Sequence, residues 1–147
     1  GGGFISRLVK NVRVERGLSY SVYSYFFPMQ LNGPFVVGLQ TRADQAQQAT
    51  GVSLDVIKKF VAEGPSEKEL ALAKNNIIGG FPLRIDSNRD ILGYLALIAY
   101  YNLPLDYLNT FTENIATVTQ KDVHETFGRH LKLNNMIKIV VGGPEEE

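Results

Sequence analysis

Two side chains that could bind a developing negative charge stand seven residues apart, Arg13 and Tyr20. A guanidinium is a permanently charged hydrogen-bond donor, and a phenol, with an ordinary pKa of about 10, is a neutral donor at pH 7. Two such donors aimed at one point could stabilise an oxyanion. Gly17 lies between them and tolerates the left-handed conformation that commonly ends a helix. If the chain reverses at Gly17, both side chains can face the same space.

The segment before this corner predicts an amphipathic helix. Its apolar residues recur at helical spacing: Phe4, Ile5, Leu8, Val9 and Val12. The predicted helix runs from about Phe4 to Glu15. Arg13 falls at the margin of the apolar stripe, so it can border a cleft.

The segment after the corner predicts a β-hairpin. Residues 18–27 are rich in Tyr, Phe, Val and Ser, which is typical of a strand. Alternation would put Leu18, Tyr20 and Val22 on one face, and Ser19, Ser21, Tyr23 and Tyr25 on the other. Asn32-Gly33-Pro34 predicts a turn, and residues 35–40 predict a second, antiparallel strand.

The rest of the chain predicts helices separated by helix breakers. Asp44 is expected to cap a helix to about Glu63, and Ser66 with Glu69 matches a capping box that opens a helix to about Gly79. The further predicted elements are a helix over 88–101 with Ile91, Leu95, Ile98 and Ala99 inward, a helix over 105–115, a helix capped by Thr119 with Val123, Phe127 and Leu131 in register, and a strand over 136–141.

This order predicts a single α+β domain over residues 1–147, with helices packed on one face of a mostly antiparallel sheet in two layers. Three strands make a thin sheet for five helices, and the opening Gly1-Gly2-Gly3-Phe4 does not read as a natural start. We therefore expect an N-terminally truncated fold whose missing strands precede Gly1. The acidic tail, residues 145–147, is expected to be solvated.

Composition argues against several classes of function. Lys plus Arg and Asp plus Glu both number 15, so no surplus charge points to nucleic acid or a lipid surface. There is no Cys, which excludes disulfides and thiol catalysis. The longest apolar stretch, residues 91–101, is too short to span a bilayer.

Other catalytic patterns are incomplete. His124-Glu125 resembles the start of a zinc-binding helix, but Gly128 stands where the second histidine should be, and His130 falls on another face. No Ser lies in a nucleophile turn, and the N-terminal Gly run lacks the remainder of a phosphate loop. The cluster Tyr20, Tyr23 and Tyr25 could stack on bases, but sheet packing is favoured without a basic surface.

Several segments of the chain form a combination that is specific when taken together. They are Gly2-Gly3-Phe4-Ile5-Ser6-Arg7-Leu8, Arg13, Arg16-Gly17-Leu18-Ser19-Tyr20-Ser21-Val22, Pro65-Ser66-Glu67-Lys68-Glu69-Leu70 and Ile115-Ala116-Thr117-Val118-Thr119-Gln120-Lys121-Asp122-Val123. Together they resemble the C-terminal domain of the pitrilysin/insulinase family of zinc peptidases, which includes insulin-degrading enzyme and the mitochondrial processing peptidases. The likeness covers nearly the whole chain. One minor departure is Val14, where the family often has an acidic residue.

The resemblance implies that the active peptidase is built from two related halves, each of which supplies different catalytic residues. The N-terminal half carries an inverted His-x-x-Glu-His zinc motif, and the C-terminal half supplies an Arg and a Tyr, here Arg13 and Tyr20. This chain has no such zinc motif. The resemblance therefore implies zinc in a partner half, on the same polypeptide or a separate subunit, and no metal or cofactor in this chain, which should be inactive alone. Peptide would be the substrate.

Two other functions stay open. The chain could be a catalytically silent structural relative, like the core subunits of respiratory complexes with this fold, or a module that adds peptides to a sheet edge. Retention of Arg13 and Tyr20 favours the peptidase half. Bacterial relatives are frequently exported, which favours the periplasm. An incomplete sheet should also pair through an open strand edge, in crystals or in solution.

Overall fold

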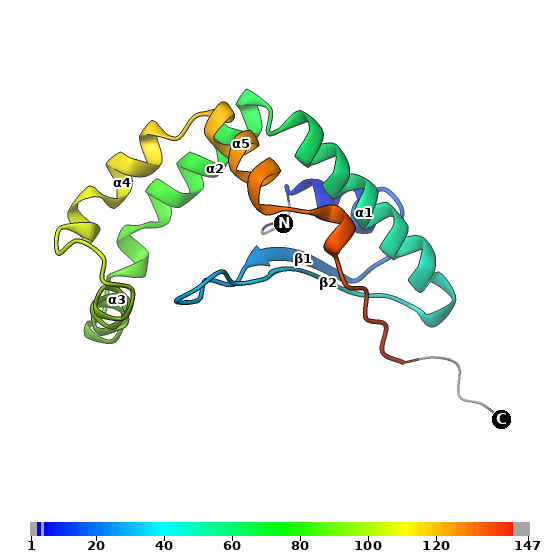
Figure 1. Cartoon of the computed structure of the whole chain (residues 1–147), viewed down its shortest axis with the longest axis horizontal. Helices are drawn as coiled ribbons and strands as arrows, with labels where there is room; N and C mark the ends of the chain where they lie inside the picture. The colour runs from blue at the N-terminus through cyan, green and yellow to red at the C-terminus, as the bar shows by residue number, and fades with distance from the viewer. Residues whose placement is uncertain (1–2, 4, 143–147) are drawn as a thin grey trace. The chain divides into compact units, whose positions relative to one another are not determined.

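The computed structural model describes residue 3 and residues 5–142 (Figure 1). Its elements are the π-helix η1 (Val9–Val14), strands β1 (Ser21–Phe26) and β2 (Phe35–Gln40), the 3-10 turn η2 (Ala43–Gln45), helices α1 (Ala46–Glu63) and α2 (Glu67–Gly80), the 3-10 turn η3 (Pro82–Arg84), helices α3 (Asn88–Tyr101), α4 (Tyr107–Thr117) and α5 (Gln120–His130), and the 3-10 turn η4 (Leu133–Asn135). The fold is α+β, as predicted. Contacts group the chain into one compact unit of residues 1–63 and 127–147 and another of residues 64–126.

The first unit is built on the predicted hairpin. Strands β1 and β2 pair antiparallel, with Ser21 opposite Gln40 and Phe26 opposite Phe35. The Phe27 N–H donates to the Pro34 carbonyl at 2.9 Å and closes the connecting loop. The hairpin is confirmed with the predicted bounds for β2, whereas β1 begins three residues later than expected.

One face of the hairpin carries the core of this unit. Helix α1 lies over that face (Figure 1), and η1 packs against both α1 and β1. The buried cluster consists of Leu8, Val9, Val12, Leu18, Val22, Ala49 and Ile57. Val12 is completely enclosed in this cluster.

The N-terminal helix is wound more widely than predicted. Within the described residues it is helical from Arg7, and residues 9–14 form a π-helix, with the Glu15 N–H donating to the Lys10 carbonyl at 2.9 Å. Phe4, the predicted first residue, lies outside the described residues. π-Turns are rare and often occur at functional sites.

The chain reverses at Gly17, as the sequence predicted. Gly17 has a φ of +60°. Its N–H donates to the Arg13 carbonyl at 3.0 Å, and the Leu18 N–H donates to the Val12 carbonyl at 2.9 Å. Both bonds span one residue more than the pair that closes an α-helix in a Schellman motif, as the wider winding requires.

The predicted alternation of faces is wrong at Tyr20. Leu18 and Val22 are buried, but Tyr20 between them is 80% exposed. Ser19, predicted on the opposite face from Leu18, is buried as well. The regular ladder begins only at Ser21, so strict alternation does not extend to residues 18–20.

The second unit is helical. Helix α2 opens with the predicted capping box, in which the Ser66 hydroxyl accepts from the Glu69 N–H at 3.3 Å and the Glu69 carboxylate accepts from the Ser66 N–H at 2.7 Å. Helices α2 and α4 pack side by side. Next to them, the rings of Phe81 and Phe111 stack with centroids 4.6 Å apart.

Helix α3 has the predicted bounds, but its predicted inward face is largely wrong. Of the four residues expected to be inward, Ile98 is buried, whereas Ile91, Leu95 and Ala99 are exposed. The described part of the chain packs little against α3, so most of its apolar stripe has no covering element.

Two further differences concern helix caps and strands. Asp44 does not cap α1 but lies in η2, where its carboxylate accepts from the Arg42 Nε at 3.0 Å in a charge-assisted bond. Residues 136–141 are not a strand, because a strand needs a hydrogen-bonded neighbour and no described segment pairs with them. Ile137 and Ile139 there are 87% and 80% exposed.

Helix α4 begins and ends two residues later than expected, and α5 follows Thr119 as predicted, with the Thr119 hydroxyl accepting from the Asp122 N–H at 3.2 Å. The acidic tail lies outside the described residues. Across the part of the chain that is described, no helix combines the length and hydrophobicity needed to cross a bilayer.

The left-handed corner makes a sharp stability prediction. Gly17→Ala should destabilise the chain by about 1–2 kcal/mol, because an L-residue is strained at positive φ even though no atom lies near the added Cβ. Gly51→Ala is the matched control, because it also meets open space but lies within α1; it should stabilise the chain by about 0.5–1 kcal/mol. Urea unfolding measures both, and an equal response at the two glycines would contradict the assigned corner.

The break in strand alternation at Tyr20 leads to a second stability prediction. Leu18→Ala should cost roughly 2–5 kcal/mol of unfolding free energy, because it opens a cavity in the core. Tyr20→Ala, two residues away, should cost at most about 1 kcal/mol, the size of an exposed cation–π contact. Thermal and urea unfolding of both variants tests this, and a loss at Tyr20 as large as at Leu18 would place Tyr20 in the core.

Candidate functional site

The fold brings Arg13 and Tyr20 into contact. Arg13 lies in the last turn of η1, and Tyr20 directly precedes β1. The Arg13 guanidinium carbon is 5.3 Å from the centroid of the Tyr20 ring, within the range of a cation–π interaction. The seven-residue spacing therefore becomes direct adjacency, because the chain turns back on itself at Gly17.

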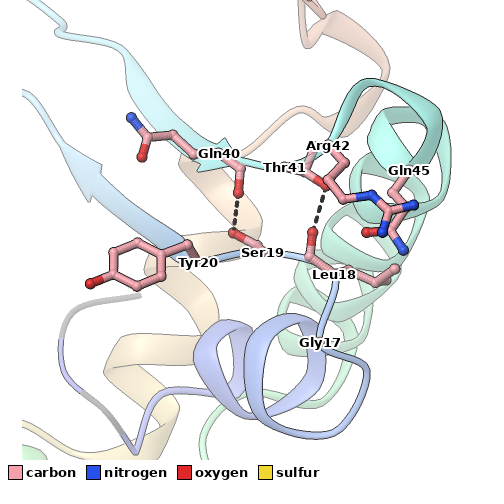
Figure 2. Close-up of a pocket in the computed structure, with 8 residues that line it drawn as sticks. All are labelled: Gly17, Leu18, Ser19, Tyr20, Gln40, Thr41, Arg42 and Gln45. Carbon is pink, nitrogen blue, oxygen red and sulfur yellow. Dashed lines mark hydrogen bonds between the residues drawn. The ribbon is translucent and has the colours of Figure 1, made fainter.

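The pair lies at the surface. Arg13 is half-buried and Tyr20 is exposed along most of its ring. In Figure 2 the Tyr20 ring points away from Leu18, Arg42 and Gln45. A phenol O–H and a guanidinium can both donate, so this corner presents a neutral and a charged donor to a molecule that approaches from outside.

A shallow pocket of about 330 Å³ lies beside Tyr20. Its lining consists of Gly17, Leu18, Ser19, Tyr20, Gln40, Thr41, Arg42 and Gln45 (Figure 2). The sequence motif accounts for the first four of these. The other four follow from the hairpin register, since pairing of Ser21 with Gln40 necessarily places the end of β2 beside the corner. Counting outward from the predicted turn could have found them.

Arg42 does not act as a second donor beside the phenol. Its guanidinium binds the Asp44 carboxylate, and this hydrogen bond lowers the pKa of Asp44 and raises that of Arg42. Both side chains are well exposed, so the pair is screened by solvent. In Figure 2 Arg42 lies on the opposite side of the pocket from the Tyr20 ring.

Metal ligands do not gather in the described ranges, 3 and 5–142. No group of three or more His, Cys, Asp or Glu side chains there could hold an ion. His124 lies against Gly64, where a Cβ on the glycine would come within 3.0 Å of its own Cβ. The His, Asp and Glu side chains of the described residues therefore do not form a donor set that fits a zinc ion.

Comparison with known proteins identifies the family. The sequence profile described as the peptidase M16 inactive domain matches residues 1–77, which include Arg13 and Tyr20. The non-peptidase homolog YmxG of Helicobacter pylori is 29% identical over 150 residues, which cover 100% of this chain and 34% of that protein. The uncharacterized zinc protease YmxG of Bacillus subtilis is 33% identical over 87 residues, which cover 59% of this chain and 21% of that protein.

Solved structures agree. The peptidase M16 inactive domain from Pseudomonas fluorescens superimposes with a TM-score of 0.83 at 42% identity, over 90% of this chain and 31% of that one. A protease from Helicobacter pylori has a TM-score of 0.76 at 18% identity, over 88% and 31% of the two chains, and supports the fold alone. The chain thus spans about a third or less of the length of these relatives. The profile match over residues 1–77 of 147 and the structural likeness show that the chain belongs to the peptidase M16 inactive-domain family.

Proposed function

We propose that this chain is the non-zinc half of a zinc metalloendopeptidase, and that Arg13 and Tyr20 bind the substrate and stabilise the oxyanion during peptide hydrolysis. The observation that carries the proposal is the stacking of the Arg13 guanidinium on the exposed Tyr20 ring, 5.3 Å from its centroid. Family membership supports it, because several relatives are named zinc proteases.

The chemistry assigned to the pair is electrostatic. Addition of water to a peptide carbonyl converts its oxygen into an oxyanion, and donors already in position stabilise that charge without reorganising. Arg13 supplies the positive charge, and the Tyr20 hydroxyl donates a hydrogen bond while keeping its proton. Closure of a partner over the exposed phenol would remove water and strengthen both interactions.

The zinc belongs to the partner half in this proposal. Zinc would activate the attacking water there, but the described residues of this chain offer no ligand set for it. This chain alone should therefore be inactive. Its contribution is to hold and orient the carbonyl oxygen through its own donors.

We further propose that this chain is most of a C-terminal half, and that the missing strands and the zinc half come from polypeptide beyond this sequence or from a separate subunit. The length of the relatives supports this, since the chain covers 34% of the Helicobacter pylori protein. So does a groove of about 620 Å³ whose lining includes β2, α1 and residues 136–142. Among the described residues, β2 pairs with β1 alone, and residues 136–142 belong to no helix or strand.

A catalytically silent partner subunit is the second candidate. The name of the Helicobacter pylori relative, non-peptidase homolog, favours it. Arg13 and Tyr20 favour the first candidate, because a silent subunit has no need of two donors in contact at the surface. The two candidates differ in whether the Tyr20 hydroxyl affects turnover.

The test is Tyr20→Phe in the complete protein, assembled with its zinc-binding half. We expect the zinc-dependent cleavage rate of a quenched fluorescent peptide library to fall by roughly 100- to 1000-fold, because one oxyanion donor is lost. The ring and its contact with Arg13 remain, so folding should be unaffected.

Tyr23→Phe is the matched control. Tyr23 is a partly exposed tyrosine on β1 that stacks on Tyr25, with ring centroids 5.9 Å apart. Its replacement by Phe should leave the cleavage rate unchanged. Undiminished cleavage by the Tyr20→Phe protein would remove the catalytic role. A complete protein with bound zinc and no peptide cleavage would favour the silent subunit.

A further inference from the structure

The segment just before β1 departs from the geometry of the sheet. Leu18 and Ser19, which are consecutive, are both buried, and Tyr20 then turns outward. The ladder register would place Tyr20 opposite Thr41. Instead the Tyr20 N–H donates to the carbonyl of Gln40, at 3.3 Å, one residue out of step. This slip is what sends the Tyr20 side chain to the surface.

Two side-chain hydroxyls hold the slipped segment in place (Figure 2). The Ser19 hydroxyl donates to the Gln40 carbonyl at 2.9 Å and also lies against the Ser21 carbonyl, so its single proton is shared between the two. The Thr41 hydroxyl donates to the Leu18 carbonyl at 2.5 Å. We call these two hydroxyls, with the hydrogen bonds that they donate, the hydroxyl clasp.

The clasp supplies hydrogen bonds just beyond the Ser21–Gln40 pair, where the regular ladder ends. A buried backbone carbonyl or hydroxyl without a partner is costly, so a chain that leaves the ladder needs other donors. Thr41 supplies one to Leu18, and Ser19 supplies one to Gln40. The Gln40 carbonyl thus receives both the Ser19 hydroxyl and the Tyr20 N–H, which fixes the backbone on the N-terminal side of the Tyr20 Cα.

We propose that Ser19 and Thr41 are positioning residues that aim Tyr20 at Arg13. Without the two hydroxyls, residues 18–20 can regain the regular ladder, and the Tyr20 ring then rotates away from the guanidinium. The effect on catalysis rests on the proposed function, whereas the effect on ring position does not. The two can therefore be tested separately.

The position of the ring can be measured in this chain alone by NMR with ¹³C-labelled tyrosine, with the Tyr20 signal assigned from its loss in Tyr20→Phe. In the otherwise unaltered chain, Arg13→Ala should shift the Tyr20 ring resonance, because it removes the cation from the ring face. In a Ser19→Ala, Thr41→Val background, that shift should shrink roughly two- to tenfold, as expected when hydrogen bonds that hold one conformer are lost.

Ser53 and Thr50 on α1 provide matched controls. Their hydroxyls donate to the Ala49 and Ala46 carbonyls at 2.8 and 2.7 Å within the helix, and neither residue lines the pocket beside Tyr20. Ser53→Ala and Thr50→Val should leave the Arg13-dependent shift at its original size. Thr41→Ser keeps the hydroxyl, so in a chain with Ser19 intact it should also leave the Arg13-dependent shift at its original size.

A full-sized shift in the clasp variant would overturn the proposal, and so would an equal reduction in the α1 controls. If the double variant does not fold, the Arg13-dependent shift is measured in the single variants Ser19→Ala and Thr41→Val and compared with the shift in Thr41→Ser. In the complete peptidase, the clasp variants should lower kcat on the order of tenfold with little change in KM, because the donor is misplaced rather than absent. A changed position of the Tyr20 ring with an unchanged kcat would contradict the proposed function, but it would still support the positioning role of Ser19 and Thr41.

Discussion

The site depends on the hydrogen bond from the Leu18 N–H to the Val12 carbonyl, which closes the left-handed turn at Gly17. Val12 and Leu18 at its two ends are both buried in the core of the first unit. Arg13 directly follows Val12 in the chain, and Tyr20 lies two residues after Leu18. Because the bond fixes the turn, the core holds these two side chains without enclosing them.

The division between buried and exposed residues follows from the winding of the chain on each side of the turn. The π-winding of η1 sends Val12 inward and leaves Arg13 at the margin. The slip before β1 buries Leu18 and Ser19 and turns Tyr20 outward. Neither element is regular, and each irregularity places one donor. Local departures from ideal structure are common where a side chain must be aimed at a partner.

Local signals in the sequence were sufficient for much of this fold. The capping box at Ser66, the breaker after Gly79 and the left-handed position of Gly17 depend on neighbouring residues, and the structure bears them out. The exposure of Tyr20 could not be predicted by alternation, because it depends on hydroxyl contacts with residues 21 to 23 positions away in the chain.

The other errors have the same origin in nonlocal contacts. Residues 136–141 have strand composition, but a strand forms only beside a partner, and the described residues provide none. Leu95 has helical spacing but remains exposed, since burial depends on what packs against a helix. The pair Arg13 and Tyr20 was found by spacing and by family resemblance; its contact distance required the structure.

The most direct test is a crystal structure of the complete zinc-loaded protein with a phosphonate peptide, whose tetrahedral phosphorus mimics the hydrolytic intermediate. The account predicts that the Tyr20 hydroxyl and the Arg13 guanidinium both donate to a phosphonate oxygen, at about 2.7–3.1 Å. A phosphonate bound at the zinc, with both side chains beyond hydrogen-bonding distance of it, would contradict the account.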